Sequence, residues 1–185
     1  RSVAALSELA QVYVSNQKPE LAEFILRKAL ELDDKSKRAA VLWNNLGLIA
    51  LERRRDQEAF AHFDQASRLD PSFAIARRNR ALVYLDAGDY KKASAELAKV
   101  VKAVPDDVAA YVALGVAERG SGDLKGAQHA YDRALALNPD SPDALYNAGV
   151  LAMEFQKAPD KALPLFERFL KVAGGSHPKR ADAQQ

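Results

Sequence analysis

The sequence has no cysteine, one methionine and one tryptophan, and its 27 Lys and Arg residues nearly balance its 25 Asp and Glu residues. The absence of cysteine excludes disulfides, thiol catalysis and thiolate metal sites, and it leaves the compartment open. The net charge of +2 is far from the basic excess of a dedicated nucleic-acid binder, so no nucleic-acid partner is expected. No apolar run reaches membrane-spanning length, so we expect no direct membrane insertion by this segment.

Catalytic and metal-binding patterns are missing as well. The three histidines, His62, His129 and His177, share no metal-ligand spacing, and we expect all three on the surface. Acidic pairs such as Asp106-Asp107 fall at expected turns, where carboxylates cap helices. The sequence therefore predicts a non-enzymatic protein with no metal site and no cofactor.

What is present is an internal repeat. A small residue recurs at a step of 34 residues, at Gly47, Ala81, Gly115 and Gly149, and a proline recurs at the same step, at Pro71, Pro105 and Pro139. Such a fixed period indicates one supersecondary unit copied along the chain.

Each period has the pattern of two amphipathic helices. In residues 40–73 the apolar positions of the first helix are Trp43, Leu46 and Ala50, and those of the second are Ala59, Phe63 and Ala66. Gly47 lets the two backbones come close because it has no Cβ. Pro71 cannot continue a helix and so ends the pair. One pair cannot bury its apolar faces, so neighbouring pairs are expected to stack.

A small residue in one helix, Ala-x-x-x-aromatic in the next and a closing proline, repeated every 34 residues, resemble the tetratricopeptide repeat. The resemblance implies an all-α fold, a right-handed superhelical solenoid of antiparallel helix pairs with about five repeats. We expect the array to cover residues 1–175, with repeats 3–36, 40–73, 74–107, 108–141 and 142–175. Residues 176–185 are expected to form a capping helix that opens at Pro178, or the start of a truncated next repeat.

Three places depart from a regular repeat. Lys37–Ala39 are extra residues, interpreted as an earlier start of the next helix. Arg53–Arg55 occupy a turn where later repeats have glycine, and we expect a solvated turn in which a left-handed Arg54 costs roughly 1 kcal/mol. One residue is inserted before Ala162, and we place it in the turn Gln156–Asp160.

In proteins with this repeat the first helix of each pair lines an inner groove that holds a partner peptide. The resemblance therefore implies a set of partner-binding positions in this sequence, most of them apolar. They are Asn44, Asn45, Leu48, Leu51, Ile75, Arg78, Asn79, Leu82, Leu85, Val112, Val116, Arg119, Tyr146, Asn147, Val150 and Met153.

Three of these positions are asparagines separated by whole periods: Asn45, Asn79 and Asn147. They are expected to stack along the groove, where an amide can both donate to and accept from a partner backbone. The alternative is that each amide only bonds a neighbouring turn.

One subset of the family clamps the C-terminal carboxylate of chaperones with basic residues. The corresponding positions here, Val41, Ile75 and Ala109, are not basic, so that clamp is not expected. An apolar groove is better suited to an amphipathic helix or an apolar extended segment.

The sequence thus predicts a scaffold that binds a protein or peptide partner. The alternatives are an oligomerisation or assembly module that docks onto copies of itself, and a regulatory domain of a larger enzyme. The alanine-rich repeats and the C-terminal exit resemble bacterial envelope proteins of gliding motility or type IV pili, which favours a periplasmic or outer-membrane-associated location over a cytoplasmic one. Arg1–Val14 has the pattern of a helix and not of a signal peptide, which indicates a segment excised from a longer protein.

Overall fold

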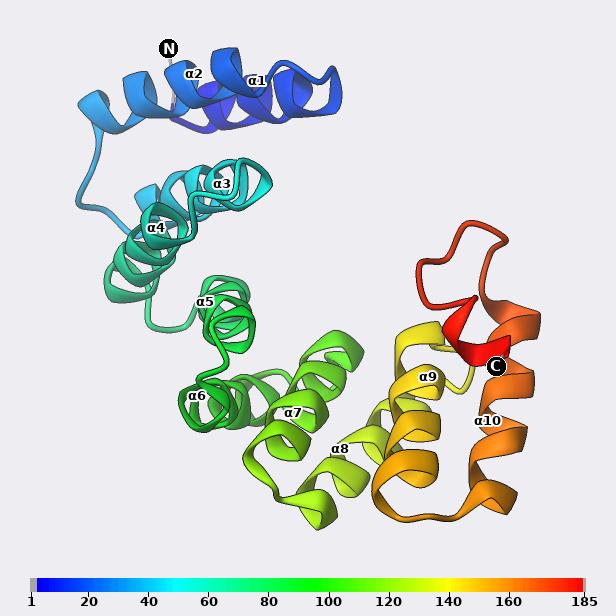
Figure 1. The fold of residues 1–185 in the computed structure, drawn as a ribbon. Helices are drawn as coiled ribbons and strands as arrows, with labels where there is room; N and C mark the ends of the chain where they lie inside the picture. Colours follow the sequence, from blue (N-terminus) through cyan, green and yellow to red (C-terminus); the bar gives the residue numbers. More distant parts are fainter. Residues whose placement is uncertain (1–2, 185) are drawn as a thin grey trace. The chain divides into compact units, whose positions relative to one another are not determined.

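The structure is a computed structural model that describes residues 3–184, and over these residues it is all-α, with ten α-helices and no strand (Figure 1). The helices are α1 (Val3–Ser15), α2 (Pro19–Leu32), α3 (Ala39–Glu52), α4 (Asp56–Leu69), α5 (Ala74–Asp86), α6 (Tyr90–Ala103), α7 (Val108–Ser121), α8 (Leu124–Leu137), α9 (Pro142–Val150) and α10 (Pro159–Val172). The predicted all-α fold is confirmed.

The chain divides into two compact units, with the division inside α5. Unit 1 comprises the residues up to Val83, and unit 2 comprises the residues from Tyr84 onward. None of the described helices is both long enough and apolar enough to span a bilayer.

Glycine packs against an aromatic ring in three helix pairs, as the repeat pattern predicts. A Cβ added to Gly47 would lie 2.4 Å from a ring carbon of Phe63. At Gly115 the same atom would lie 2.3 Å from Tyr131, and at Gly149 it would lie 2.6 Å from Phe166. Real Cβ atoms do not approach this closely, so each pair depends on a glycine for its helix spacing.

Within each unit the second helix of one pair also packs on the first helix of the next. In unit 1, Leu26 of α2 shares a buried cluster with Leu42 and Leu46 of α3. In unit 2, Tyr131 of α8 shares a buried cluster with Leu151, which directly follows α9. This packing supplies the burial that one pair alone cannot achieve.

The extra residues before the second repeat mainly lengthen a connection. Helix α3 begins at Ala39, only one residue before the position that corresponds to Ala74 at the start of α5. The other extra residues lie between α2 and α3, where Asp33 accepts a hydrogen bond from the backbone amide of Ser36 at 3.0 Å. The interpretation of Lys37–Ala39 as an earlier helix start therefore holds for Ala39 alone.

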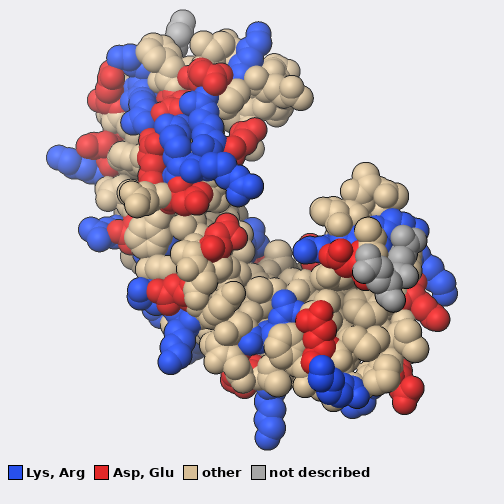
Figure 2. Space-filling model, in the orientation of Figure 1, with Lys and Arg blue, Asp and Glu red and all other residues tan. Residues whose placement is uncertain are grey.

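The sequence predicted a solvated turn between α3 and α4, but two of its three arginines form ion pairs with other residues. Arg54 is exposed and left-handed, with φ 58°, as expected. Its neighbours Arg53 and Arg55 each form an ion pair with Glu23 of α2 at 3.0 Å. Arg55 also pairs with Glu58 at 2.8 Å. Figure 2 shows acidic and basic side chains intermixed over this part of unit 1.

The inserted residue of the last repeat lies between Ala152 and Lys157. The amide of Ala158 donates to the carbonyl of Ala152, six residues earlier, whereas Asp123 donates to Glu118, five residues earlier. The turn itself keeps its form, since Lys157 has φ 53° and occupies the left-handed position. The extra residue therefore precedes Lys157.

That residue is taken up as a π-helical turn, Leu151–Phe155, at the end of α9. The amide of Gln156 donates to the carbonyl of Leu151, five residues earlier, at 3.1 Å. The prediction of an insertion within the turn Gln156–Asp160 is right in part: the connection 156–158 is one residue longer than the connection 122–123 of the previous pair. The π-helical turn directly before it, which the sequence did not predict, shares the adjustment, because a helix can absorb one residue as a single wider turn.

Two further expectations are corrected. His62 is buried and not on the surface, with its ring centroid 5.3 Å from that of Trp43. No α-helix opens at Pro178, since turns are followed by a short 3-10 helix, Asp182–Gln184. Whether residues 176–185 cap the array or begin a further repeat stays a prediction.

Candidate protein-binding faces on the odd-numbered helices

The predicted groove residues lie on α3, α5, α7 and α9 and on the π-helical turn, and they differ in exposure. Leu48, Ile75 and Leu82 are exposed, and Asn44, Asn79 and Val112 are buried. The other residues of the set are partly buried: Asn45, Leu51, Arg78, Leu85, Val116, Arg119, Tyr146, Asn147, Val150 and Met153. Their contact with a partner stays a prediction, and the two units are described separately.

In unit 1, two of the asparagines bond each other. The side-chain Nδ2 of Asn79 donates to Oδ1 of Asn44 at 2.9 Å. The two residues are only 7% and 4% exposed, so this bond joins α5 to α3 in the interior. Burial of an amide is tolerated because the hydrogen bond replaces its water. This geometry does not favour Asn79 as a contact for a partner.

In unit 2, Asn147 bonds its own helix. Its Nδ2 donates to the carbonyl of Asp143 at 2.8 Å, and its Oδ1 accepts a hydrogen bond of 3.4 Å from Nη2 of Arg119. The alternative interpretation of the asparagines, a local bond to a neighbouring turn of backbone, therefore describes Asn147 better than the ladder does.

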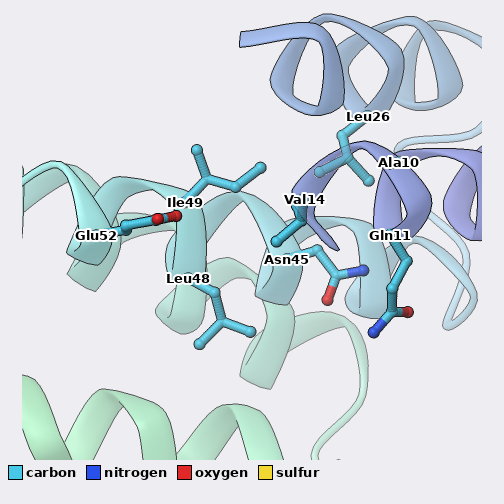
Figure 3. Close-up of a pocket in the computed structure, with 8 residues that line it drawn as sticks. All are labelled: Ala10, Gln11, Val14, Leu26, Asn45, Leu48, Ile49 and Glu52. Atoms are coloured by element: carbon cyan, nitrogen blue, oxygen red, sulfur yellow. The ribbon is translucent and has the colours of Figure 1, made fainter. Parts of the chain in front are cut away.

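Asn45 differs from both, because its side chain lines an apolar pocket of about 100 Å³ in unit 1 (Figure 3). The pocket lies between α1 and α3 and is lined by Ala10, Gln11, Val14, Leu26, Asn45, Leu48, Ile49 and Glu52. Figure 3 shows the amide side chains of Asn45 and Gln11 extending in the same direction from their two helices. Within the described part of the chain, no hydrogen bond engages either side-chain amide.

The sequence set did not include Gln11 and Val14, which line this pocket. The first repeat has neither the glycine nor the closing proline of the later repeats, so its groove positions do not stand out in the sequence. A signal was present, since Gln11 and Val14 precede Leu48 and Leu51 by the same number of residues once the extra residues are counted.

Unit 2 has a different pocket, of about 380 Å³, beside the π-helical turn. It is lined by Tyr90, Val116, Arg119, Gly120, Val150, Glu154 and Phe155. Gly120 packs closely against Tyr90, since an added Cβ would lie 2.4 Å from its ring. The guanidinium carbon of Arg119 lies 5.7 Å from the ring centroid of Phe155, a cation–π contact.

Burial raises the pKa of two further polar groups of unit 2. Burial raises the pKa of Tyr131 to about 12, and burial with the nearby Asp123 carboxylate raises the pKa of Glu118. The Tyr131 hydroxyl and Oε2 of Glu118 have no hydrogen-bond partner within the described chain. Nη1 of Arg119 is likewise buried and without a partner there.

A second hollow in unit 2, of about 660 Å³, lies between α9, the π-helical turn and α10. The predicted residues Tyr146, Val150 and Met153 line it, and Asp182 and Ala183 of the C-terminal segment also border it. The Tyr146 hydroxyl lies 3.3 Å from Oδ2 of Asp182, so the segment is tied to α9. Across residues 3–184, no three His, Asp or Glu side chains gather as a metal site would require.

Comparison with known sequences agrees with this architecture. One profile of the tetratricopeptide repeat matches residues 7–74 and 112–178, and another matches residues 50–115. This chain belongs to the tetratricopeptide repeat family. Proteins of this family are in general non-enzymatic. The chain is a scaffold for protein–protein interaction of the tetratricopeptide type.

Two curated relatives illustrate the range of similar tetratricopeptide proteins. The Hsp70-Hsp90 organizing protein of Triticum aestivum is 35% identical over 95 residues, which cover 51% of this chain and 16% of that protein. The mitochondrial import receptor subunit TOM70 of Homo sapiens is 21% identical over 175 residues, which cover 91% of this chain and 28% of that protein. The chain thus spans less than a third of the length of either relative.

Solved structures share the fold of this tetratricopeptide chain. MamA of Desulfovibrio magneticus superposes with a TM-score of 0.80 at 22% identity, covering 92% of this chain and 94% of that one. Pseudomonas aeruginosa pilF also superposes with a TM-score of 0.80 at 23% identity, covering 100% of this chain and 82% of that one. YrrB, a tetratricopeptide protein with an unusual peptide-binding site, gives 0.74 at 23% identity, covering 97% and 90%. The predicted solenoid class is confirmed, and at these identities the likeness concerns the fold alone.

Proposed function

We propose that this chain binds a segment of a partner protein on the faces of its odd-numbered helices, with the α1–α3 pocket of unit 1 as an anchor. The single observation that carries the proposal is the environment of Asn45. A free amide stands beside an apolar hollow, next to Leu48, which is 45% exposed.

The chemistry of this pocket suits an extended peptide or the apolar face of a helix. A volume of about 100 Å³ admits one aliphatic side chain. The amides of Asn45 and Gln11 offer both donors and acceptors for the backbone or a polar side chain beside it. The partner class is therefore a protein segment with an exposed aliphatic residue.

The test is a selection of random dodecapeptides on immobilised chain, followed by titration of the enriched peptides against variants. Asn45→Ala removes one neutral hydrogen bond of about 0.5–1.5 kcal/mol, so we expect affinity to fall roughly two- to tenfold. Leu48→Asp places a charge at the pocket and is expected to weaken binding further.

A matched control is available in the same unit. Leu21 of α2 is also 45% exposed but does not line the pocket, so Leu21→Asp should bind like the parent chain. Melting temperatures are compared first. If Asn45→Ala and Leu48→Asp bind as tightly as Leu21→Asp, the partner uses another surface and the proposal is wrong.

The other expectations stay predictions. Self-association, a regulatory role in a larger enzyme, and a place in bacterial motility or pilus assembly remain alternatives. The likeness to pilF does not choose among them, because it concerns the fold. Analytical ultracentrifugation across a range of concentrations would detect self-association directly.

A further inference from the structure

Unit 2 differs from a regular repeat at the π-helical turn Leu151–Phe155, where a single extra residue widens the end of α9. The last residue of this turn, Phe155, is 46% exposed and lies on the guanidinium of Arg119. Isolated π-turns are rare and occur frequently at functional sites. Here the widened turn supplies one wall of the 380 Å³ pocket.

Arg119 is incompletely satisfied in this pocket. Its Nη2 donates only a long hydrogen bond of 3.4 Å to Asn147, and its buried Nη1 has no partner within residues 3–184. Arginine cannot lose its proton in a protein, so a buried N–H of arginine that has no acceptor destabilises the folded state. Such a group in a native structure calls for an explanation.

The lining of the pocket around this charge is about equally polar and apolar. Tyr90, Val116, Val150 and Phe155 supply its apolar part, while the acidic Glu154 is exposed at the same pocket. The described ion pairs do not join Glu154 to Arg119. Burial of Nη1 strengthens the attraction between the guanidinium and an incoming anion.

The geometry points to Arg119 as the receptor for a carboxylate of a protein segment bound to unit 2, a specificity-determining contact that rests on the proposed function above. A planar carboxylate can take both terminal nitrogens of a guanidinium in two parallel hydrogen bonds. Nη1 is buried, so access to it requires a neighbouring side chain to move. The segment that binds unit 2 therefore carries an acidic group.

This contact is not the chaperone-type clamp. The positions of that clamp carry Val41, Ile75 and Ala109 here. Arg119 lies near the C-terminal end of α7 instead, beside a turn that only this last repeat contains.

Two sources of the carboxylate, an acidic side chain or a chain terminus, are separated by three synthetic peptides. The probes are acetyl-Leu-Ala-Asp-Ala-Leu-amide, the same peptide with Asn in place of Asp, and the Asn peptide with a free C-terminal acid. Binding is followed by NMR at the Nε–H of Arg119. We expect one of the two carboxylate peptides to bind about tenfold tighter than the neutral peptide.

The variants are Arg119→Gln and a matched Arg133→Gln. Arg133 is an exposed arginine of the same unit that also lies over an aromatic ring, Tyr111, but does not line the pocket. Arg119→Gln should abolish the preference for the carboxylate, and Arg133→Gln should retain it. Deleting Glu154 restores the 34-residue spacing and should also abolish the preference, with the helical circular dichroism unchanged.

A preference that survives in Arg119→Gln, or equal affinity for all three peptides, overturns the assignment of Arg119. If all three bind equally and lose affinity in Asn45→Ala, the proposed function stands and only the carboxylate contact falls. If none binds, the carboxylate contact falls, and the titrations of Asn45→Ala and Leu48→Asp decide the proposed function separately.

Discussion

The N-terminal ends of the helices are held differently in the two units. In unit 1, none of the residues that precede α2, α3 and α4 caps its helix with a side chain, and they are Lys18, Arg38 and Arg55. In unit 2, the four helices α6 to α9 are each capped by a side-chain oxygen, from Asp89, Asp107, Asp123 and Ser141. Unit 1 must therefore hold its turns by other means.

The means in unit 1 is the cluster around Glu23. Three arginines, Arg27, Arg53 and Arg55, contact its carboxylate at 2.8–3.0 Å. Burial alone would raise the pKa of Glu23, but the hydrogen bonds and charges of Arg27 and Arg55 hold it below its ordinary value. The α3–α4 turn of unit 1 is thus stabilised by ion pairs and the α7–α8 turn of unit 2 by a cap, while α10 of unit 2 has no side-chain cap.

The backbone of the turn is the same in both cases. Arg54 has φ 58° and Gly122 has φ 89°, although an arginine is strained in this region and a glycine is not. The helix pair therefore requires a left-handed residue at this position, and the local sequence decides only how much strain that residue carries.

The largest effect is expected from removing the centre of the cluster. Glu23→Ala leaves several arginines without this partner, and hydrogen bonds to charged groups contribute about 1.5–3 kcal/mol, so we expect unit 1 to lose about 2 kcal/mol. Urea unfolding followed by the fluorescence of Trp43, the single tryptophan, measures it in unit 1. Glu31→Ala, which breaks only an exposed pair with Lys28, should change stability by less than about 1 kcal/mol. Equal effects of the two variants would show that the cluster is not special.

A cap removed from unit 2 is expected to have a smaller effect. Asp123 accepts a hydrogen bond from the amide of Gly126 at 2.9 Å, and loss of such a cap typically costs about 1 kcal/mol, so Asp123→Ala should lower the circular-dichroism midpoint. The converse variant Lys18→Asp gives α2 the side-chain cap that it lacks and should raise the Trp43 midpoint. No gain from Lys18→Asp would mean that the ion pairs already compensate for the missing cap.

The smallest effect is a pH dependence confined to unit 1. Burial lowers the pKa of His62 from its ordinary 6.5, against a weaker opposing effect of Glu58. The unfolded chain then binds a proton below pH 6.5 that the folded chain does not, so stability should fall slightly as the pH drops from 7 toward 5. Trp43, stacked on this ring, reports the transition. In His62→Gln the slope should vanish, and a slope that persists would assign it to other groups.

The sequence alone was enough to predict the repeat. A step of 34 residues, helical apolar spacing, and a glycine facing an aromatic residue are local patterns, and the contacts of Gly47 with Phe63 and of Gly115 with Tyr131 follow from them. The left-handed residue at Arg54 was also predictable, because every pair needs a turn of the same shape.

The tertiary structure decided the partners of the polar side chains. Asn79 looked equivalent to Asn45, yet it bonds Asn44, 35 residues away, while Asn45 is left free beside the pocket. His62 is buried against Trp43, and the extra residue became a π-turn that carries Phe155 onto Arg119. The repeat can be predicted because its period is a property of the spacing of residues along the chain. These contacts cannot, because they depend on how one helix pair packs against the next.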